Sequence, residues 1–384
     1  MKNIVIIGAG IGGLTTAIAL KQKGFQVSIY EQASEIKPVG AGILLANNAM
    51  QVYEKLGLRQ EIEEAGNIIS SLNITKKDLS PISKMSMTGF EEKYGVRNVA
   101  IHRGLLQQFL ASRLADHECY LGKKLTAITE KDGRYILDFT DGSSTTAELV
   151  IGADGIHSSV RHLWFGNGTI RNAQQLCWRG MTEYALPFSF QHELNEAWGK
   201  GDRFGIVPIS RHKVYWFAVK KYKGKEPRWD THDIGSHFST YHPLIGKLIS
   251  LTPADSIHVT GISDLRPLAS WVREGVCLLG DAAHATTPNM GQGACQAIED
   301  AYVLAESLDQ YPTHPEALAH YQRLRIAKAH DIVAKSRILG KIAHLQNPIL
   351  TAIRNFLLKA TPPSVSIKQS DKIFQLAECK KKGA

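Results

Sequence analysis

Residues 3–31 read NIVIIGAGIGGLTTAIALKQKGFQVSIYE, and this stretch sets the expected fold. A β-branched run ending at Ile7 predicts a buried strand, and the apolar spacing after it predicts a helix that ends at Gly24. A second apolar run ends at Tyr30 and predicts another strand. The order is strand, helix, strand, which predicts a parallel sheet covered by helices.

The first turn of this unit carries the spacing G-x-G-x-x-G at Gly8, Gly10 and Gly13. Gly8 permits a tight turn, Gly10 lets the backbone approach a pyrophosphate, and Gly13 lets the helix pack closely on the strand. Glu31 follows the second strand, where a carboxylate can accept a hydrogen bond from an adenosine ribose. Because Glu31 would repel a 2′-phosphate, the turn is predicted to bind FAD or NAD rather than NADP.

Two later apolar runs, residues 149–153 and 275–279, are predicted strands that also lead into an aspartate, Asp154 and Asp281. Open α/β sheets bind ligands at the carboxyl ends of their strands. A helix pattern begins after Gly293, and its free N–H groups and positive dipole end would face an electron-rich ligand. Asp281 could accept hydrogen bonds from hydroxyl groups of that ligand.

Two further stretches are candidates for the same ligand. The glycine-rich residues 36–43 would let backbone at Gly42 approach a flat molecule, a surface turn being the alternative. Arg103 and Gln107 are one helical turn apart and share a face. An arginine in the first helical turn opposes the helix dipole unless an anion is near, so Arg103 is predicted to face a phosphate. The alternative for Arg103 is a plain surface charge.

The 384 residues are expected to form two interleaved domains. Five cysteines without a C-x-x-C pair argue against disulfides and structural zinc, and with no signal-peptide pattern they favour the cytoplasm. The net charge of +9 raises nucleic acid or anionic membrane as partners, but no nucleic-acid-binding module is recognisable. Positive charge also favours anionic small molecules.

Residues 1–171 and 274–310 are predicted to form the cofactor domain in two parts. Strand-like runs and aromatic residues in 172–273 predict an inserted, mostly antiparallel sheet, with the substrate between the two domains. Residues 311–384 are predicted to be helices, with a poorly ordered basic tail beyond Thr361. Apolar and basic positions in the predicted helix 339–358 would suit a membrane surface; docking on the protein itself, or on a second copy in a homodimer, are the alternatives.

Three motifs together resemble the single-component FAD-dependent aromatic hydroxylases of the para-hydroxybenzoate hydroxylase type. They are Gly8-x-Gly10-x-x-Gly13…Glu31, Asp154-Gly155-x-x-Ser158-x-x-Arg161 and Gly280-Asp281-x-x-His284-x-x-x-Pro288. The resemblance covers roughly residues 1–340. It implies an α/β fold: a glutathione-reductase-type, Rossmann-like FAD-binding domain, an inserted mostly antiparallel β-sheet substrate domain, and C-terminal helices.

The resemblance also implies roles for individual positions. Glu31 matches the residue that binds the adenosine ribose, and Arg103 matches the arginine on the phosphate side of FAD. Asp281 matches the aspartate on the ribityl chain, and Asp154 and Arg161 match the motif for FAD and NAD(P)H handling. The loop beside the reactive edge of the flavin is matched by Pro288, Gly291 and Gly293. His284 is expected to make a structural hydrogen bond. Because no second G-x-G-x-x-G is present, NAD(P)H is expected to visit transiently.

Within that family, Cys177-Trp178-Arg179-Gly180 with Arg203 and Tyr215 is similar to the FAD-dependent urate hydroxylase branch. That branch has an arginine and a tyrosine facing the substrate and an acidic residue after the proline, where this chain has Asn289. A neutral Asn289 cannot hold the charge of a proton relay, so another aromatic or N-heterocyclic acid is at least as good a candidate as urate. Arg203, Tyr215, Pro288 and Asn289 are therefore the candidate catalytic residues. A structural ion pair is the alternative for Arg203, and packing is the alternative for Tyr215.

The expected activity is an FAD-dependent, NAD(P)H-consuming monooxygenation, in which a flavin C4a-hydroperoxide formed with O2 hydroxylates a small electron-rich aromatic or N-heterocyclic compound. A quinone-precursor or lipid-like substrate at a membrane surface is the first alternative. A flavoprotein scaffold without turnover is the second. No metal site is predicted.

Overall fold

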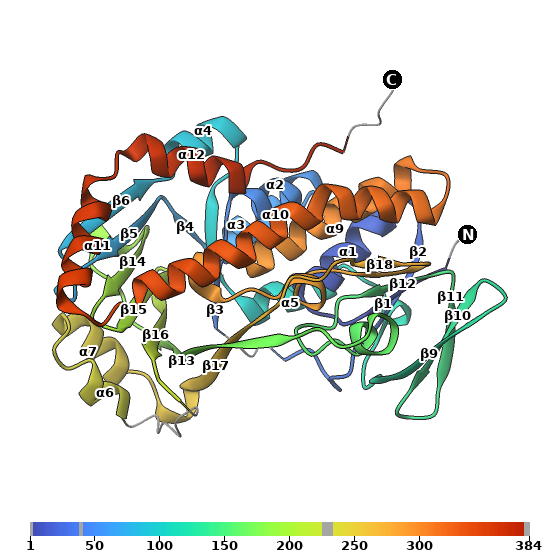
Figure 1. The fold of residues 1–384 in the computed structure, drawn as a ribbon, viewed down its shortest axis with the longest axis horizontal. Coiled ribbons are helices and arrows are strands. Elements are labelled where there is room, and N and C mark those ends of the chain that lie inside the picture. Colours follow the sequence, from blue (N-terminus) through green and yellow to red (C-terminus); the bar gives the residue numbers. More distant parts are fainter. Residues whose placement is uncertain (1–2, 38–40, 225–232, 380–384) are drawn as a thin grey trace.

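The computed structural model describes residues 3–37, 41–224 and 233–379. A mostly parallel sheet lies toward one end of the molecule and a larger, mostly antiparallel sheet toward the other (Figure 1). Helix α10, His314–Ala343, runs along the molecule between the two ends. Predicted residues 38–40 of the glycine-rich loop and the lysines at 380–382 lie outside the described residues.

The first sheet is six-stranded, in the order β18-β19-β12-β1-β2-β8. Its strands are β1 Asn3–Ile7, β2 Gln26–Tyr30, β8 Cys119–Tyr120, β12 Leu149–Gly152, β18 Val272–Arg273 and β19 Val276–Leu278. Neighbouring strands are parallel except for the β18–β19 pair. Strands β12 and β19 are buried throughout, as expected of parallel strands with both faces covered.

The second sheet is seven-stranded, in the order β17-β13-β16-β15-β14-β5-β6. Its strands are β5 Ser71–Thr75, β6 Pro81–Ser86, β13 Ile170–Glu183, β14 Glu193–Trp198, β15 Asp202–Ser210, β16 Lys213–Lys221 and β17 His258–Leu265. All neighbours are antiparallel except β14 and β5. Strands β5 and β6 come from residues 1–171, which were predicted to belong to the cofactor domain. This sheet therefore contains strands from both sides of the expected domain boundary.

Two smaller antiparallel sheets complete the strands. They contain β3 Gly42–Leu45, β4 Asn67–Ile69 and β7 Asn98–His102, and β9 Leu125–Lys131, β10 Arg134–Phe139 and β11 Ser144–Ala147. A turn at Asp141-Gly142 joins β10 to β11.

The helices cover the sheets and form the C-terminal region. Besides α10 they are α1 Ile11–Gln22, α2 Asn47–Lys55, α3 Arg59–Ala65, α4 Thr88–Tyr94, α5 Arg103–Ala111, α6 Asp233–His237, α7 Pro243–Ser250, α8 Asp281–His284, α9 Gly293–Gln310, α11 Pro348–Ala360 and α12 Pro363–Phe374. Within the described ranges, no helix has both the length and the apolar content to cross a bilayer.

Helix α12 corrects one expectation, because residues 363–374 are not a poorly ordered tail. Asp371 accepts hydrogen bonds from Lys93 and from the Tyr94 hydroxyl, and Phe374 packs edge-on against Phe90 at 4.9 Å between ring centroids. These partners lie on or beside α4, far away in sequence, and they hold α12 against the protein.

Candidate cofactor and substrate site

The three motifs found in the sequence follow three neighbouring parallel strands. Strand β1 pairs with β12, and β12 pairs with β19, so their carboxyl ends lie side by side at one edge of the sheet. Asp154 and Asp281 lie just beyond β12 and β19 at this edge, as the glycine turn lies beyond β1. The predicted convergence of the three strand ends is confirmed.

The glycines of the first turn have two different environments. Gly8 has a φ of +106°, and a Cβ on it would lie 2.5 Å from the carbonyl oxygen of Ala153. A Cβ on Gly13 would lie 2.0 Å from the carbonyl oxygen of Gly8. A Cβ on Gly10 would have no atom within 4 Å. Gly8 and Gly13 are therefore required by the packing of the protein itself, whereas Gly10 leaves open space beside the N-terminus of α1.

Glu31 and Gln107 both contact the backbone of this turn. Glu31 accepts hydrogen bonds from the N–H groups of Ala9 at 2.7 Å and Ala33 at 2.9 Å. The side-chain amide of Gln107 donates to the carbonyl oxygen of Ala9 at 2.8 Å. These bonds hold the turn in place from the end of β2 and from α5.

Asp154 and Arg161 use their side chains to connect loops. Asp154 accepts from the Ser158 hydroxyl and from the N–H of Val160 at 3.1 Å, and burial raises its pKa. The buried Arg161 guanidinium donates to the carbonyl oxygens of Ile156 and, at 2.8 Å, of Ala282. Arg161 therefore joins the second strand-end loop to the third.

Asp281 and Arg103 present opposite charges to one recess. The Asp281 side chain is exposed, yet desolvation by surrounding protein raises its pKa. The positive charge of Arg103 is near enough to lower the pKa of Asp281. Among the described residues, Arg103 has no ion-pair partner, and its side chain is exposed at the start of α5.

The loop from Pro288 to Gly293 borders the same recess. Pro288 and Gly291 are exposed, and Gly291 has a φ of +62°. Helix α9 begins at Gly293 without a side-chain cap, which leaves N–H groups free. A Cβ on Gly293 would lie 4.0 Å from an Asp281 carboxylate oxygen, so the helix end adjoins Asp281.

These features fit a dinucleotide such as FAD. The open backbone at Gly10 suits a pyrophosphate, and Arg103 supplies a cation that the described protein leaves unpaired. Asp281 offers acceptors to hydroxyl groups, and the uncapped end of α9 attracts negative charge.

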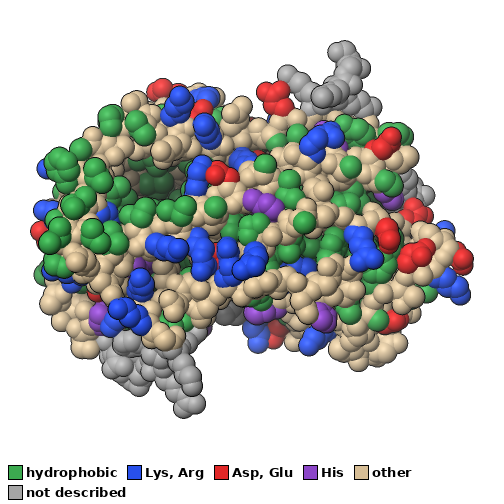
Figure 2. Space-filling view, in the orientation of Figure 1, with side chains coloured by type: hydrophobic (Ala, Val, Ile, Leu, Met, Phe, Trp, Pro, Cys, Tyr) green, Lys and Arg blue, Asp and Glu red, His purple; other side chains and the backbone are tan. Residues whose placement is uncertain are grey.

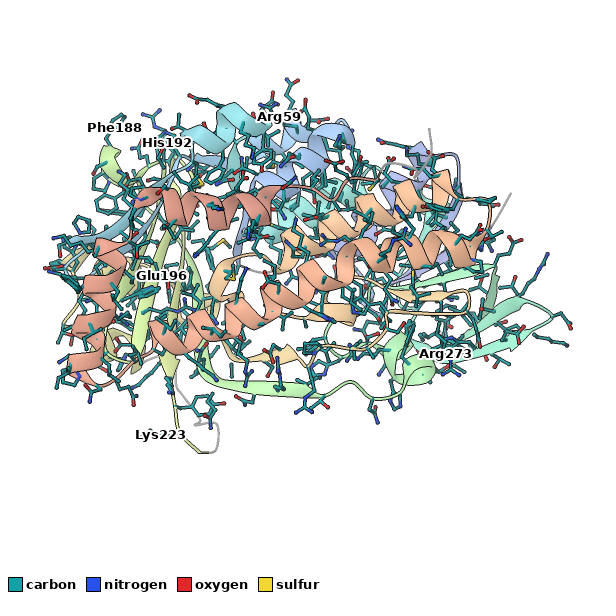
Figure 3. All side chains as sticks on the ribbon, turned by 45° about the horizontal axis from the view of Figure 1, so that its top comes forward. Arg59, Phe188, His192, Glu196, Lys223 and Arg273 are labelled. Atoms are coloured by element: carbon teal, nitrogen blue, oxygen red, sulfur yellow. The ribbon has the colours of Figure 1, made fainter. Side chains whose placement is uncertain are left out.

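On the side of the seven-stranded sheet, Arg203 is buried in an ion pair. Its Nη1 donates to Glu196 at 2.7 Å, and its Nη2 donates to the side-chain oxygen of Asn289. Figure 3 places Glu196 in this part of the molecule. The Nε of Arg203 is buried and has no hydrogen-bond partner within the described ranges. The ion-pair alternative for Arg203 is therefore what the structure shows.

Asn289 is held by three partners on different elements. Besides accepting from Arg203, its Nδ2 donates to the Thr287 hydroxyl at 2.8 Å and to the carbonyl oxygen of Ser336 at 2.9 Å. Since Arg203 lies on β15 and Ser336 on α10, Asn289 ties the loop before α9 to both.

Tyr215 lies at the contact between the two sheet systems. A Cβ on Gly42 would lie 2.6 Å from the Tyr215 ring, so only a glycine lets the ring pack on this backbone. Burial raises the pKa of the Tyr215 hydroxyl, and the positive charge of Arg179 opposes that rise. Gly42 thus contacts an aromatic side chain of the protein, although it was predicted to approach a flat ligand.

His284 has the structural role that was expected. It is buried and hydrogen-bonded to Asp300, which also accepts from the N–H of Gly280 at 3.0 Å. Burial alone would raise the pKa of Asp300, but the charges of His284 and Arg325 lower it to about 2. Arg325, on α10, donates to Asp300 at 2.7 Å and to Glu299, and so fixes the Gly280-Asp281 loop from behind.

Sequence reasoning missed Glu196, Ser336 and Asp300 as partners of the site. A signal existed for Glu196, because Gly199-Lys200-Gly201 is a turn pattern that makes a hairpin of the flanking strands. In that hairpin Trp198 lies opposite Arg203, which brings Glu196 close to Arg203. No local signal could place Ser336, which arrives from α10.

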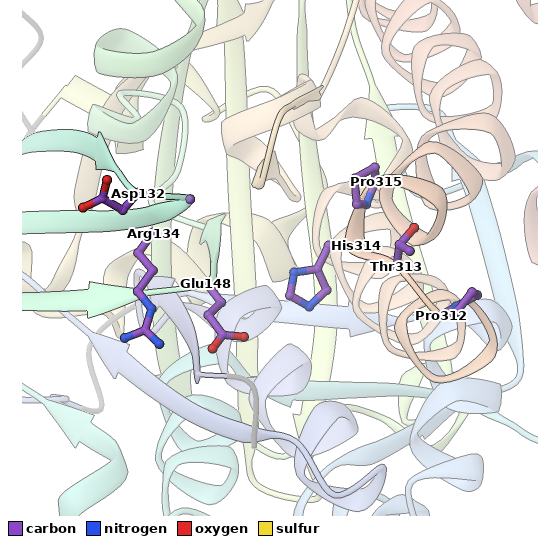
Figure 4. Close-up of a pocket in the computed structure, with 8 residues that line it drawn as sticks. Asp132, Arg134, Glu148, Pro312, Thr313, His314 and Pro315 are labelled. Carbon is purple, nitrogen blue, oxygen red and sulfur yellow. The ribbon is translucent and has the colours of Figure 1, made fainter.

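Two cavities open on the surface of the described residues. One, of about 430 Å³, is lined by Asp132, Gly133, Arg134, Glu148 and residues 312–315 (Figure 4). It contains none of the predicted site residues. A second, of about 220 Å³, is lined by the predicted site residue Arg161 together with Ser158 and His162. The space-filling view shows a further hollow with an apolar surround beside α10, α11 and α12 (Figure 2).

Comparison with known proteins identifies the family. A family model described as "FAD binding domain" matches residues 1–336. The chain is 36% identical to aurachin C monooxygenase/isomerase of Stigmatella aurantiaca, covering 93% of this chain and 94% of that protein. It is 34% identical to the FAD-dependent urate hydroxylase of Klebsiella pneumoniae, covering 91% and 92%. It is 31% identical to 2-heptyl-3-hydroxy-4(1H)-quinolone synthase of Pseudomonas aeruginosa, covering 97% of each.

A solved structure shows the same architecture. Klebsiella pneumoniae HpxO, complexed with FAD and uric acid, superposes with a TM-score of 0.89 at 28% identity, covering 97% of this chain and 96% of that one. The chain therefore belongs to the FAD-binding monooxygenases of this family. The predicted family, its α/β fold and its FAD cofactor, with NAD(P)H as the reductant of the class, are confirmed.

Proposed function

We propose that this monooxygenase hydroxylates a small, neutral, N-heterocyclic aromatic compound that carries apolar substituents. The observation that carries the proposal is the ion pair between the buried Arg203 and the partly buried Glu196, on neighbouring strands of the seven-stranded sheet. The predicted substrate class included aromatic and N-heterocyclic acids. The proposal narrows that class to neutral N-heterocyclic compounds.

The cofactor is proposed to lie along the three strand ends. Gly10 and Arg103 would hold the phosphates, Glu31 the adenosine ribose and Asp281 the ribityl hydroxyls, while Gly8, Gly13, Asp154 and Arg161 keep the loops in position. Bound FAD supplies the redox and oxygen chemistry, with electrons from NAD(P)H. The uncapped end of α9, near Gly291, would stabilise negative charge on the ring system by about 0.3–2 kcal/mol.

The charge state of Arg203 argues against an anionic substrate. Its guanidinium already pairs with the Glu196 carboxylate at 2.7 Å, so the net charge of the pair is zero. A substrate carboxylate at this wall would lose its hydration and meet the negative charge of Glu196, which is costly in a poorly solvated site. The unpartnered Nε–H of Arg203 could still donate to a carbonyl oxygen of a neutral ring.

The relatives support an N-heterocyclic ring by what they act on. One is a urate hydroxylase and another makes a 4(1H)-quinolone with a heptyl group. Asn289 gives this wall no acidic residue after Pro288, which further separates the chain from the urate pattern.

The test compares neutral substrates with anionic ones: carboxylated analogues of the same ring, and urate. We expect 2-alkyl-4(1H)-quinolones to stimulate NADPH or NADH oxidation and to yield oxygenated product, and their carboxylated analogues and urate to do so at least about tenfold less well. Glu196→Gln should shift this ratio toward the anions, because it frees the charge of Arg203. Strong stimulation of the wild-type protein by urate or by carboxylates, with none by neutral quinolones, would contradict the proposal.

A further inference from the structure

Helix α11 has its polar side turned inward and its apolar side turned to solvent. Its buried residues are Thr351 and Arg354. The Arg354 guanidinium donates to the carbonyl oxygen of Ala343 at 2.8 Å and lies over the Trp198 ring at 5.1 Å. A surface helix of a globular protein normally has the opposite arrangement. This helix therefore docks through polar contacts and leaves its apolar face unpartnered.

That face continues onto the neighbouring helices. We call these side chains the apolar rim; all are at least 40% exposed: Ile338 and Ile342 of α10, Ile349, Leu350, Ile353, Phe356 and Leu357 of α11, and Val365 and Ile367 of α12. Phe356 and Ile349 reach 70% and 69%. Figure 2 shows apolar side chains gathered at this end of the molecule. Contiguous exposure of this kind marks an interaction surface.

The segment that carries the apolar rim has charges of one sign. Residues 332–370 contain six lysines and arginines and no aspartate or glutamate. Lys341, Lys359 and Lys368 are exposed, one on each of the three helices. Basic side chains also follow α10 in Figure 2. An apolar face bordered by lysines is complementary to a surface that is apolar inside and anionic outside.

We propose that the apolar rim docks on the surface of an anionic phospholipid bilayer. The isoleucines and Phe356 would enter the boundary between headgroups and acyl chains, and the three lysines would contact lipid phosphates. A second copy of the chain fits this surface less well. A two-fold interface would bring the lysine-bearing helices of both copies together, and their positive charges would repel. The hollow beside α10–α12 would then open toward the membrane, where apolar substrates concentrate (Figure 2). The docking does not depend on which compound is hydroxylated.

The experiment is co-sedimentation of the FAD-loaded full chain with vesicles. We expect binding to vesicles of phosphatidylglycerol and phosphatidylcholine, weak binding to phosphatidylcholine alone, and release at high salt. Phe356→Ser with Leu357→Ser should lower the partition coefficient by about tenfold or more, and Lys359→Glu by about tenfold. The matched control is Leu163→Ser, an exposed leucine outside the apolar rim, which should leave partitioning unchanged. Melting temperature and flavin absorbance establish that each variant is folded.

Two outcomes would overturn the proposal. One is wild-type protein that stays in the supernatant with anionic vesicles at low salt. The other is a dimer in size-exclusion chromatography that Phe356→Ser with Leu357→Ser converts to monomer, with vesicle binding unaffected, since the apolar rim would then be a contact between copies. Hydroxylation of a neutral quinolone can fail without affecting either result, because vesicle binding is measured without substrate.

Discussion

The proposed site has a cofactor wall and a substrate wall, and different chemical groups form them. The cofactor wall consists mainly of backbone: glycine turns, strand ends and the uncapped end of α9. The substrate wall consists of side chains that satisfy one another, above all Arg203 with Glu196 and Asn289. A wall formed by backbone depends on the positions at which glycine is required, and a short sequence motif shows those positions. Side-chain walls depend on partners from several distant segments.

The largest expected difference is between alanine substitutions at two glycines of the cofactor wall, Gly13 and Gly10. We expect Gly13→Ala to destabilise the apoprotein by more than about 3 kcal/mol, because its Cβ would collide with the carbonyl oxygen of Gly8. Gly10→Ala should melt as the wild type does but bind FAD more weakly. Gly89→Ala, which also meets no atom within 4 Å, is the control and should change neither quantity. Thermal melting and FAD titration measure both. A normal melting temperature for Gly13→Ala would show that the close contact is not required.

The stability of the substrate wall should depend on the opposite charges of Arg203 and Glu196. Glu196→Gln leaves the buried charge of Arg203 unpaired, which we expect to lower the free energy of unfolding by about 3–5 kcal/mol. Adding Arg203→Gln should recover much of that loss. The nearby Lys84–Glu193 pair is the control: Lys84 is 59% exposed, so Lys84→Gln should cost less than about 1 kcal/mol. Urea unfolding measures all four proteins. Equal losses for Glu196→Gln and Lys84→Gln would refute the buried character of the first pair.

Asp281 is the main side-chain contributor to the cofactor wall. Asp281→Ala should weaken FAD binding roughly 10- to 100-fold, since hydrogen bonds to a charged group are lost. The protein should then purify largely colourless and regain flavin only at high FAD concentration, as measured by absorbance and fluorescence titration. Full yellow occupancy of this variant would contradict the role proposed for Asp281.

The smallest expected effect is a pH dependence from His344 behind the substrate wall. Burial first, and then the charge of Arg203, lowers the pKa of His344 to about 3, whereas an unfolded histidine titrates near 6.5. Unfolding therefore takes up a proton below pH 6.5, and the free energy of unfolding falls as pH decreases from there toward 3. At pH 5 this loss is about 2 kcal/mol. His344→Gln should reduce the difference in stability between pH 7 and pH 5, whereas His212→Gln, at an exposed position, should not.

Particular residues show how much of the structure could be predicted from the sequence. Gly8, Gly10 and Gly13 were placed with their separate tasks, and the structure gives Gly8 and Gly13 the close contacts expected of them. His284 was correctly expected to be structural. Arg203 and Tyr215 lie on the inserted sheet as expected, but the partner of Arg203, Glu196, was not identified, and α12 was mistaken for a tail. A carboxylate beside an arginine, or a helix beside Phe90, is set by packing between segments that local patterns do not describe.

The sequence by itself determined the family, the α/β fold, the FAD cofactor and the three strand ends that meet. These follow from local rules: where glycine is needed, where a strand stops and where a helix starts. Only the tertiary structure decided that Arg203 is neutralised, that Gly42 supports Tyr215, and that α11 turns its apolar side outward. Each of these depends on which distant side chain occupies the neighbouring space.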